Sequence, residues 1–284
     1  MEKIIIDKLK RYFGGRPEVL FAYLFGSCAA GLEREESDID IAVYFNPLNK
    51  RAEYEKRQEY PQESEIRFDL VRMLETDNLD LVVLNQAYPV LASSIIEYGI
   101  PIVIKDENLL LEFLSTVQTE TEDFYGFVED YWRIYQEAHS LSPQQRVRLL
   151  ERIQYLDIEI KEASLFKGMT FDIYRENKVQ RRNLERWVEN IANVTIDIAK
   201  IILASEKKQM PKSYKDALFD FGFFFGLKEE EAKRFSEIAD LRNLLAHEYL
   251  DILYEKIRNF LISISPFYEK LVSFLKNYTK EAAR

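Results

Sequence analysis

The sequence predicts an α+β domain, with a mixed sheet and flanking helices, followed by an all-α helical bundle. Up to about residue 106, short apolar runs that are typical of strands alternate with helical segments. From Glu107 onward there is almost no strand signal, and long stretches have helical periodicity. We therefore expect a first domain at 1–106, a helical connector at 107–141 and a second domain at 142–284.

The first domain is expected to hold four strands. Residues 2–13 precede them as an amphipathic helix that ends at Gly14-Gly15. Glycine, proline or asparagine ends most of the strand-like runs, and a further helix is expected at 88–99. The polar segment 51–65 is helical or irregular. The expected strands are residues 19–27, 38–45, 79–85 and 100–106.

The second domain is expected to consist of helices alone. Ser142 is a candidate N-cap with Pro143 at the first helical position, which separates the connector from the bundle. The helical patterns before and after this break cover 109–139, 146–168, 181–206, 230–252 and 255–278.

Composition excludes several classes of protein. Of the 284 residues, 47% are hydrophobic and 31% are charged, as in a soluble globular protein. No apolar run approaches the length of a membrane span, and the first residues lack a signal-peptide pattern, so we expect a cytoplasmic protein that does not contact a membrane. Cys28 is the only cysteine, which rules out an intrachain disulfide. The net charge of −10 argues against sequence-blind binding of nucleic acid, although a local basic site remains compatible with it.

The strongest motif joins Gly26-Ser27 to an aspartate pair. Gly26 directly follows a strand, and a small residue there lets backbone N–H groups and the Ser27 hydroxyl approach a phosphate. Asp38 and Asp40 begin the next strand, and side chains two residues apart on a strand point to the same side. Two adjacent carboxylates repel each other unless a divalent cation lies between them, and Mg²⁺ prefers carboxylate and phosphate oxygens. Such a site could activate a hydroxyl and stabilise leaving pyrophosphate.

This motif, Gly26-Ser27-x-x-x-Gly31-x5-Ser37-Asp38-Ile39-Asp40, resembles the polymerase β-type nucleotidyltransferase superfamily, and most of all its minimal nucleotidyltransferase (MNT) branch. The resemblance implies a metal-dependent enzyme that uses ATP as substrate, with Gly26 and Ser27 at the nucleotide. It also implies a third metal-binding carboxylate on a neighbouring strand. Asp80 fits best, at the start of the third strand, and Asp69 in IRFDLV is the alternative.

A second motif lies in IADLRNLLAHEYLD, from Ile238, which is expected to form one helix. Asn243 and His247 are four residues apart and share a helix face, and Arg242 and Tyr249 align in the same way. An imidazole could move the proton of an RNA 2′-hydroxyl, and the guanidinium of Arg242 could stabilise charge on the phosphate. The structural alternative is an ordinary packed histidine, with Arg242 paired to Glu237 or Asp240.

The pattern Arg242-Asn243-x3-His247-x-Tyr249 at the end of an all-helical domain resembles the HEPN superfamily. Residues 184–199 are similar to the central helix of its DUF86 or HepT-like branch. The resemblance implies a metal-independent ribonuclease that dimerises so that two motifs face one cleft. A homodimer and an RNA substrate of the tRNA type are therefore the expected partners.

Proteins that resemble these two domains occur as toxin–antitoxin pairs, in which the MNT protein transfers AMP from ATP to a tyrosine of the HEPN ribonuclease. This chain carries both modules, and Tyr249 occupies the acceptor position. The resemblance therefore implies an adenylyltransferase that silences its own ribonuclease domain.

Two other functions stay open at the level of the sequence. Aminoglycoside nucleotidyltransferases also join this catalytic core to a helical domain, which there binds the small-molecule acceptor. Alternatively, the helical domain is a non-catalytic dimerisation module.

A further pattern is a basic stripe at helical spacing, made by Arg175, Lys178, Arg182 and Arg186. Such a stripe suits an RNA backbone, but its acidic neighbours make a solvated surface the preferred interpretation.

Overall fold

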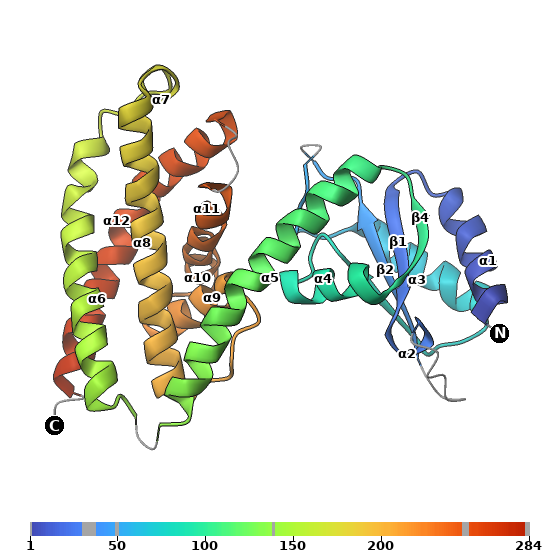
Figure 1. Cartoon of the computed structure of the whole chain (residues 1–284), viewed down its shortest axis with the longest axis horizontal. Helices are drawn as coiled ribbons and strands as arrows, with labels where there is room; N and C mark the ends of the chain where they lie inside the picture. The colour runs from blue at the N-terminus through green and yellow to red at the C-terminus, as the bar shows by residue number, and fades with distance from the viewer. Residues whose placement is uncertain (1, 30–37, 49–50, 138–139, 246–249, 282–284) are drawn as a thin grey trace. The chain divides into compact units, whose positions relative to one another are not determined.

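The computed structural model describes residues 2–29, 38–48, 51–137, 140–245 and 250–281 (Figure 1). The chain divides into two compact units, Met1–Asp123 and Phe124–Arg284. The division falls within one helix, α5 (Glu107–Tyr135), which covers most of the expected connector. Within the described residues, no helix combines the length and apolarity that crossing a membrane requires.

The first unit is built on a four-stranded sheet with the order β3-β2-β1-β4. β1 pairs antiparallel with both β2 and β4, whereas β2 pairs parallel with β3. This mixed sheet confirms the predicted fold class, and its strands are β1 (Val19–Phe25), β2 (Ile39–Phe45), β3 (Leu79–Val83) and β4 (Ile100–Ile104).

Helices cover both faces of the sheet (Figure 1). On one face, α1 and α3 pack against the strands and bury a group of residues that includes Leu9, Phe13 and Ile66. On the other face, α4 and the first half of α5 bury Ile95 and Phe113. Both faces of the strands are therefore apolar, which explains their near-continuous hydrophobic runs. The helices are α1 (Glu2–Gly14), α2 (Gly26–Ala29), α3 (Pro61–Leu74) and α4 (Pro89–Tyr98).

The second unit is helical throughout its described residues, as predicted. α8 is its central helix and is buried on most sides, and Asn177 caps it by accepting a hydrogen bond from the Gln180 amide. The N-cap expected at Ser142 is confirmed, since its hydroxyl accepts from the Gln145 amide. The elements are α6 (Pro143–Glu162), the 3-10 turn η1 (Ala163–Phe166), α7 (Phe171–Glu176), α8 (Lys178–Ser205), α9 (Tyr214–Phe224), α10 (Glu229–Ser236), α11 (Ile238–Leu245) and α12 (Leu250–Glu281).

The helical pattern at 230–252 is divided between helices, since α10 ends at Ser236 and α11 begins at Ile238, where the helix of the second motif is expected to start. The basic stripe is not on one helix either. Arg175 belongs to α7, where it pairs with Asp172 and Glu176, and α8 starts after the Asn177 cap.

A group of charges joins α5, α6 and α8 inside the second unit. Asp130 lies 2.9 Å from the Lys200 ammonium and 3.1 Å from the Arg148 guanidinium, and it also contacts Arg133. Lys200 is almost fully buried and also pairs with Asp197 at 3.1 Å. Burial alone would raise the pKa of Asp130, but the hydrogen bonds from Arg148 and Lys200 outweigh it and hold that pKa well below its ordinary value.

Candidate functional site

Gly26 follows directly after β1, whose last residue, Phe25, pairs with Asp40 of β2. Its φ of +73° is a left-handed conformation that side chains disfavour. A Cβ atom added there would lie 1.9 Å from Oδ2 of Asp40. Glycine is thus required for two reasons, the backbone conformation and the lack of room for a Cβ atom. Its backbone lies directly against the Asp40 carboxylate. Ser27 follows as a half-buried residue of α2.

Asp40 lies directly opposite Asp80 in the parallel pairing of β2 with β3. Residues in register on adjacent strands project to the same face, so the two carboxylates are neighbours. Burial raises the pKa of Asp40, and the charges of Asp80 and then Asp38 raise it further. Asp38 is exposed and comes just before β2. The charges of the other two acids therefore both act on Asp40.

Asp69, the alternative third carboxylate, lies elsewhere. It belongs to α3, where its Oδ2 accepts a hydrogen bond of 2.9 Å from the Tyr12 hydroxyl and lies 3.7 Å from Arg16. These contacts hold α3 against α1, on the helix layer that covers the sheet. The structure thus brings Asp80, and not Asp69, into register with Asp40.

The donor chemistry of these acids suits a divalent cation. No three histidine, cysteine or acidic side chains among the described residues form a ready-made group for a metal ion. The mutual repulsion that raises the pKa of Asp40 is nevertheless the feature that a bound cation relieves, and carboxylate oxygens are the ligands that Mg²⁺ prefers. Asp38, Asp40 and Asp80 are therefore the residues that would hold it.

In the second unit, Arg242 of α11 is fixed by two side chains that sequence reasoning did not single out. Its Nε donates to Oδ1 of Asn193 on α8 at 2.8 Å. Its guanidinium lies 4.6 Å from the centroid of the Tyr214 ring, at the start of α9. Asp240 does not take Arg242 as its ion-pair partner, since its carboxylate binds Lys215 at 3.0 and 3.1 Å. No local pattern marks Asn193, which is 49 residues from Arg242.

The remaining residues of the second motif are not placed. The side chain of Asn243, and the residues His247 and Tyr249, lie outside the described part of the chain. Their expected alignment with Arg242 on one helix face stays a prediction.

Comparison with known proteins identifies both units. A family model for "Polymerase beta, Nucleotidyltransferase" matches residues 7–108. A family model for "Ribonuclease HepT-like" matches residues 147–275. A curated relative, the tRNA nuclease HepT of Aphanizomenon flos-aquae, is 32% identical over 109 residues, which cover 38% of this chain and 70% of the relative.

Solved structures of toxin–antitoxin proteins show a limited likeness. One, a toxin–antitoxin with AMP-PNP, is 25% identical, with 46% of this chain and 98% of that chain covered at a TM-score of 0.35. Another, the tri-AMPylated Shewanella oneidensis HEPN toxin in complex with MNT antitoxin, is 22% identical with the same coverage and a TM-score of 0.33.

The order of the two matched families along the chain agrees with the order of the two motifs and of the two compact units. The chain belongs to the HepT-like ribonuclease family through its C-terminal domain, which one polypeptide joins to a nucleotidyltransferase domain of the polymerase β type.

Proposed function

We propose that the N-terminal domain is a metal-dependent adenylyltransferase that transfers AMP from ATP to Tyr249 and thereby silences a ribonuclease in the C-terminal domain. The observation that carries the first half of this proposal is the close approach of Gly26 to Asp40, with Asp80 in register beside it. The presence of a HepT-like domain in the same chain supports the second half.

In the transfer reaction, the Tyr249 oxygen bonds to the α-phosphorus of ATP. The bond from that phosphorus to the bridging oxygen of the β-phosphate breaks, pyrophosphate leaves, and the tyrosine proton passes to solvent or to a neighbouring base. The backbone at Gly26 and the Ser27 hydroxyl would bind phosphate oxygens, because glycine leaves the N–H groups open to close approach.

Mg²⁺ held by Asp38, Asp40 and Asp80 would favour loss of the proton from the attacking hydroxyl and stabilise the charge that gathers on pyrophosphate. The β2–β3 pairing fixes the positions of Asp40 and Asp80, and Asp38 precedes β2 directly. Burial of Asp40 keeps its carboxylate away from bulk water, which strengthens its interaction with any cation it faces.

The C-terminal domain would cleave RNA without a metal. The 2′-oxygen attacks the adjacent phosphorus, the bond to the 5′-oxygen of the next nucleotide breaks, and a cyclic phosphate and a 5′-hydroxyl result. His247 would take or give the proton, Asn243 would support it, and Arg242 would stabilise the charge on the phosphate. The name of the relative, a tRNA nuclease, supports tRNA as the substrate.

AMP on Tyr249 would add bulk and negative charge two residues from His247. That negative charge would repel an RNA phosphate. A homodimer formed through the helical domain would place two such motifs at one cleft. The HepT-like match favours this account over an aminoglycoside-type acceptor site in the helical domain.

The proposal is tested by measuring RNA cleavage before and after incubation with ATP and Mg²⁺. The wild-type protein should lose cleavage of a tRNA substrate after this incubation. Asp40→Asn, which cannot transfer AMP, should keep cleavage under the same conditions. Equal loss in both proteins would contradict the proposed silencing, and a thermal-shift series with ATP, aminoglycosides and tRNA would identify the ligand class instead.

A further inference from the structure

A cavity of about 490 Å³ opens on the second unit between the end of α6, η1 and the first half of α8. It does not contain any residue of the two motifs. One side is apolar and aromatic, since the Phe166 ring lies 5.0 Å from the Trp187 indole at an interplanar angle of 39°. The indole is fixed because its Nε1 donates to the Glu159 carbonyl at 2.8 Å. The indole is only 4% exposed, so the half-buried Phe166 ring is the surface on which a planar ligand would stack.

The polar side of the cavity includes three amide side chains from one face of α8, Gln180, Asn183 and Asn190, and the charged side chains of Glu162 and Arg186 also line it. Each amide offers both a donor and an acceptor, the combination that the edge of a nucleobase requires. An aromatic surface opposed by amides therefore fits a base better than a lipid.

Glu159 adds an acceptor that is only 8% exposed. Its Oε1 accepts from Asn190 Nδ2 at 3.3 Å, and Tyr155 also hydrogen-bonds to it. No Lys, Arg or His among the described residues forms an ion pair with it. An ionised carboxylate has about four acceptor positions. A ligand that brings N–H donors into the cavity would satisfy those that remain, and an exocyclic amino group is such a donor.

The cavity and the arginine of the second motif are both in contact with α8. Asn190 lines the cavity and Asn193 holds Arg242, and the two are three residues apart on α8. That spacing places them on neighbouring turns, about 4.5 Å apart along the helix axis. A nucleotide with its base in the cavity and its phosphate toward Arg242 would therefore span a short stretch of one helix face.

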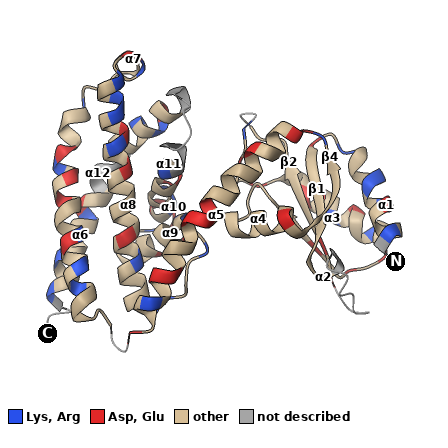
Figure 2. Cartoon of the chain, viewed as in Figure 1, with Lys and Arg blue, Asp and Glu red and all other residues tan. Residues whose placement is uncertain are grey.

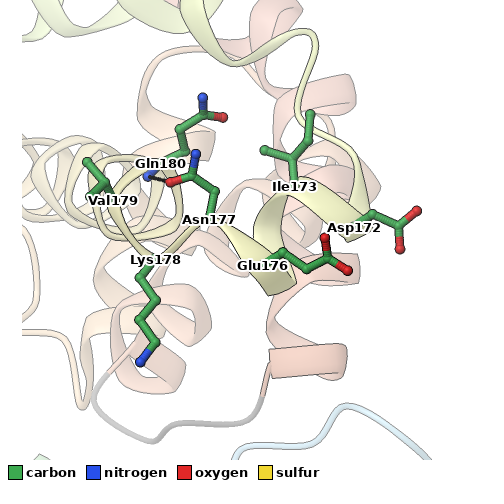
Figure 3. Close-up of a pocket in the computed structure, with 7 residues that line it drawn as sticks. All are labelled: Asp172, Ile173, Glu176, Asn177, Lys178, Val179 and Gln180. Carbon is green, nitrogen blue, oxygen red and sulfur yellow. Dashed lines mark hydrogen bonds between the residues drawn. The ribbon is translucent and has the colours of Figure 1, made fainter.

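Basic side chains at the start of α8 suit the backbone of such a ligand. Figure 2 shows Lys and Arg positions on these first turns, next to α7. Within the described residues, Lys178 and Arg182 are exposed and form no ion pair, unlike Arg186, which binds Glu189 at 2.9 Å. A second hollow of about 640 Å³ shares Gln180 with the cavity, and Asp172, Glu176 and Lys178 are among its lining residues, next to the point where the Asn177 side chain caps α8 (Figure 3).

We propose that this cavity binds one nucleobase that carries an exocyclic amino group, cytosine, adenine or guanine, in preference to uracil. That the base belongs to an RNA substrate rests on the proposed ribonuclease function, whereas binding of the base itself does not. The cavity would then select which nucleotide is placed next to the phosphate that Arg242 contacts.

The direct test uses the fluorescence of Trp187. The chain has two tryptophans, so Trp132→Phe leaves Trp187 as the reporter. The probes are CMP and UMP, which differ at C4 by an amino group in place of a carbonyl oxygen. CMP should change the fluorescence saturably, and UMP should bind at least about tenfold more weakly, the value of one hydrogen bond to a charged group. Equal binding of CMP and UMP, or no saturable change with either, overturns the proposal.

Variants locate the binding site. Glu159→Gln should weaken the binding of CMP about tenfold and leave the binding of UMP unchanged, because it removes the charge of the acceptor. Glu151→Gln, an exposed change two turns earlier on α6, is the matched control and should bind CMP as the parent does. Asn183→Leu, at an exposed position of the rim, tests the same site should Glu159→Gln fail to fold. Unchanged CMP binding in folded Glu159→Gln contradicts the assignment.

RNA cleavage separates this inference from the proposed function. Cleavage that favours cytosine over uracil at one position, with the preference lost in Glu159→Gln, supports both. Binding of CMP without any RNA cleavage by the wild-type protein supports the cavity and contradicts the ribonuclease. Cleavage with no base preference, unaltered by Glu159→Gln, contradicts the role of the cavity and leaves the ribonuclease standing.

Discussion

The backbone of Gly26 lies so close to the Asp40 carboxylate that a methyl group on Gly26 would overlap Oδ2, 1.9 Å away. Gly26→Ala should therefore displace Asp40 and lower AMP transfer by about a hundredfold, the scale of a misplacement near 1 Å. It should also destabilise the domain by about 1 kcal/mol, because of the left-handed backbone. Gly14→Ala is the control, since a Cβ there meets nothing within 4 Å. Rates from a pyrophosphate-release assay that are equal in the two variants would contradict this relationship.

The two candidate third acids should respond in opposite ways. Asp80→Asn should lower AMP transfer about a hundredfold or more, because it removes a charge that faces Asp40. Asp69→Asn should keep the transfer rate and lower only the thermal midpoint, because it weakens the hydrogen bond from Tyr12. Steady-state rates and melting curves for both proteins check this. A loss of transfer in Asp69→Asn alone would show that the third carboxylate is misassigned.

The contact from Asn193 to Arg242 should orient the guanidinium for RNA cleavage. Asn193→Ala should lower kcat about tenfold with little change in KM, since it frees Arg242 Nε without removing the charge. Asn193→Asp keeps an acceptor at the same position and should restore most of kcat. Arg242→Lys should not substitute for arginine, because lysine lacks the planar fork. An Asn193→Ala enzyme with wild-type kcat would leave Asn193 with a packing role only.

Asp130 should give the second unit acid-sensitive stability. Its folded pKa is held below the ordinary value, so its contribution is present above the unfolded pKa and is lost as pH falls toward the folded pKa. At pH 7, Asp130→Asn should lower the free energy of unfolding by about 3 kcal/mol, because it leaves buried Lys200 with Asp197 as its one remaining acidic partner and removes an acceptor of Arg148. The difference from wild type should shrink progressively below about pH 4. Denaturant titrations across pH that show a constant difference would refute this assignment.

Asp220 should show the opposite dependence. Burial, followed by the nearby charge of Asp216, raises the pKa of Asp220 to about 6. Its folded pKa lies above the unfolded one, so its favourable contribution is complete below about pH 4 and is lost as pH rises through 6. Asp220→Asn should therefore be more stable than wild type at pH 7 to 8, by about 1 kcal/mol after allowance for its partial exposure. A variant that is less stable at pH 8 would contradict the raised pKa.

The parts of the fold and site that sequence predicts are local ones. The Gly26-Ser27 turn and the alternation of Asp38 and Asp40 can be predicted because each depends only on one strand and the loop beside it. The choice between Asp80 and Asp69 depends on which segment pairs with β2, a contact 40 residues away that no local pattern encodes. IRFDLV is compatible with a strand by composition, yet it lies in α3, which begins at Pro61 and packs on α1.

The second motif shows the same division. Its residues can be recognised in the sequence. The two partners of Arg242 cannot, because Asn193 and Tyr214 come from two other helices. The break between α10 and α11 falls at Glu237, inside a stretch whose apolar periodicity is continuous, so the periodicity does not reveal it.

The central claim is that the chain adenylylates its own Tyr249, and intact-mass spectrometry with peptide mapping tests it most directly. Wild-type protein with ATP and Mg²⁺ should gain the mass of AMP on the peptide that contains Tyr249, and Tyr249→Phe and Asp38→Ala/Asp40→Ala should gain none. A mixture of Asp40→Asn with Tyr249→Phe tells transfer between copies from transfer within one chain. No gain in the wild-type protein, alone or in mixtures, or an equal gain in Tyr249→Phe, would contradict the account.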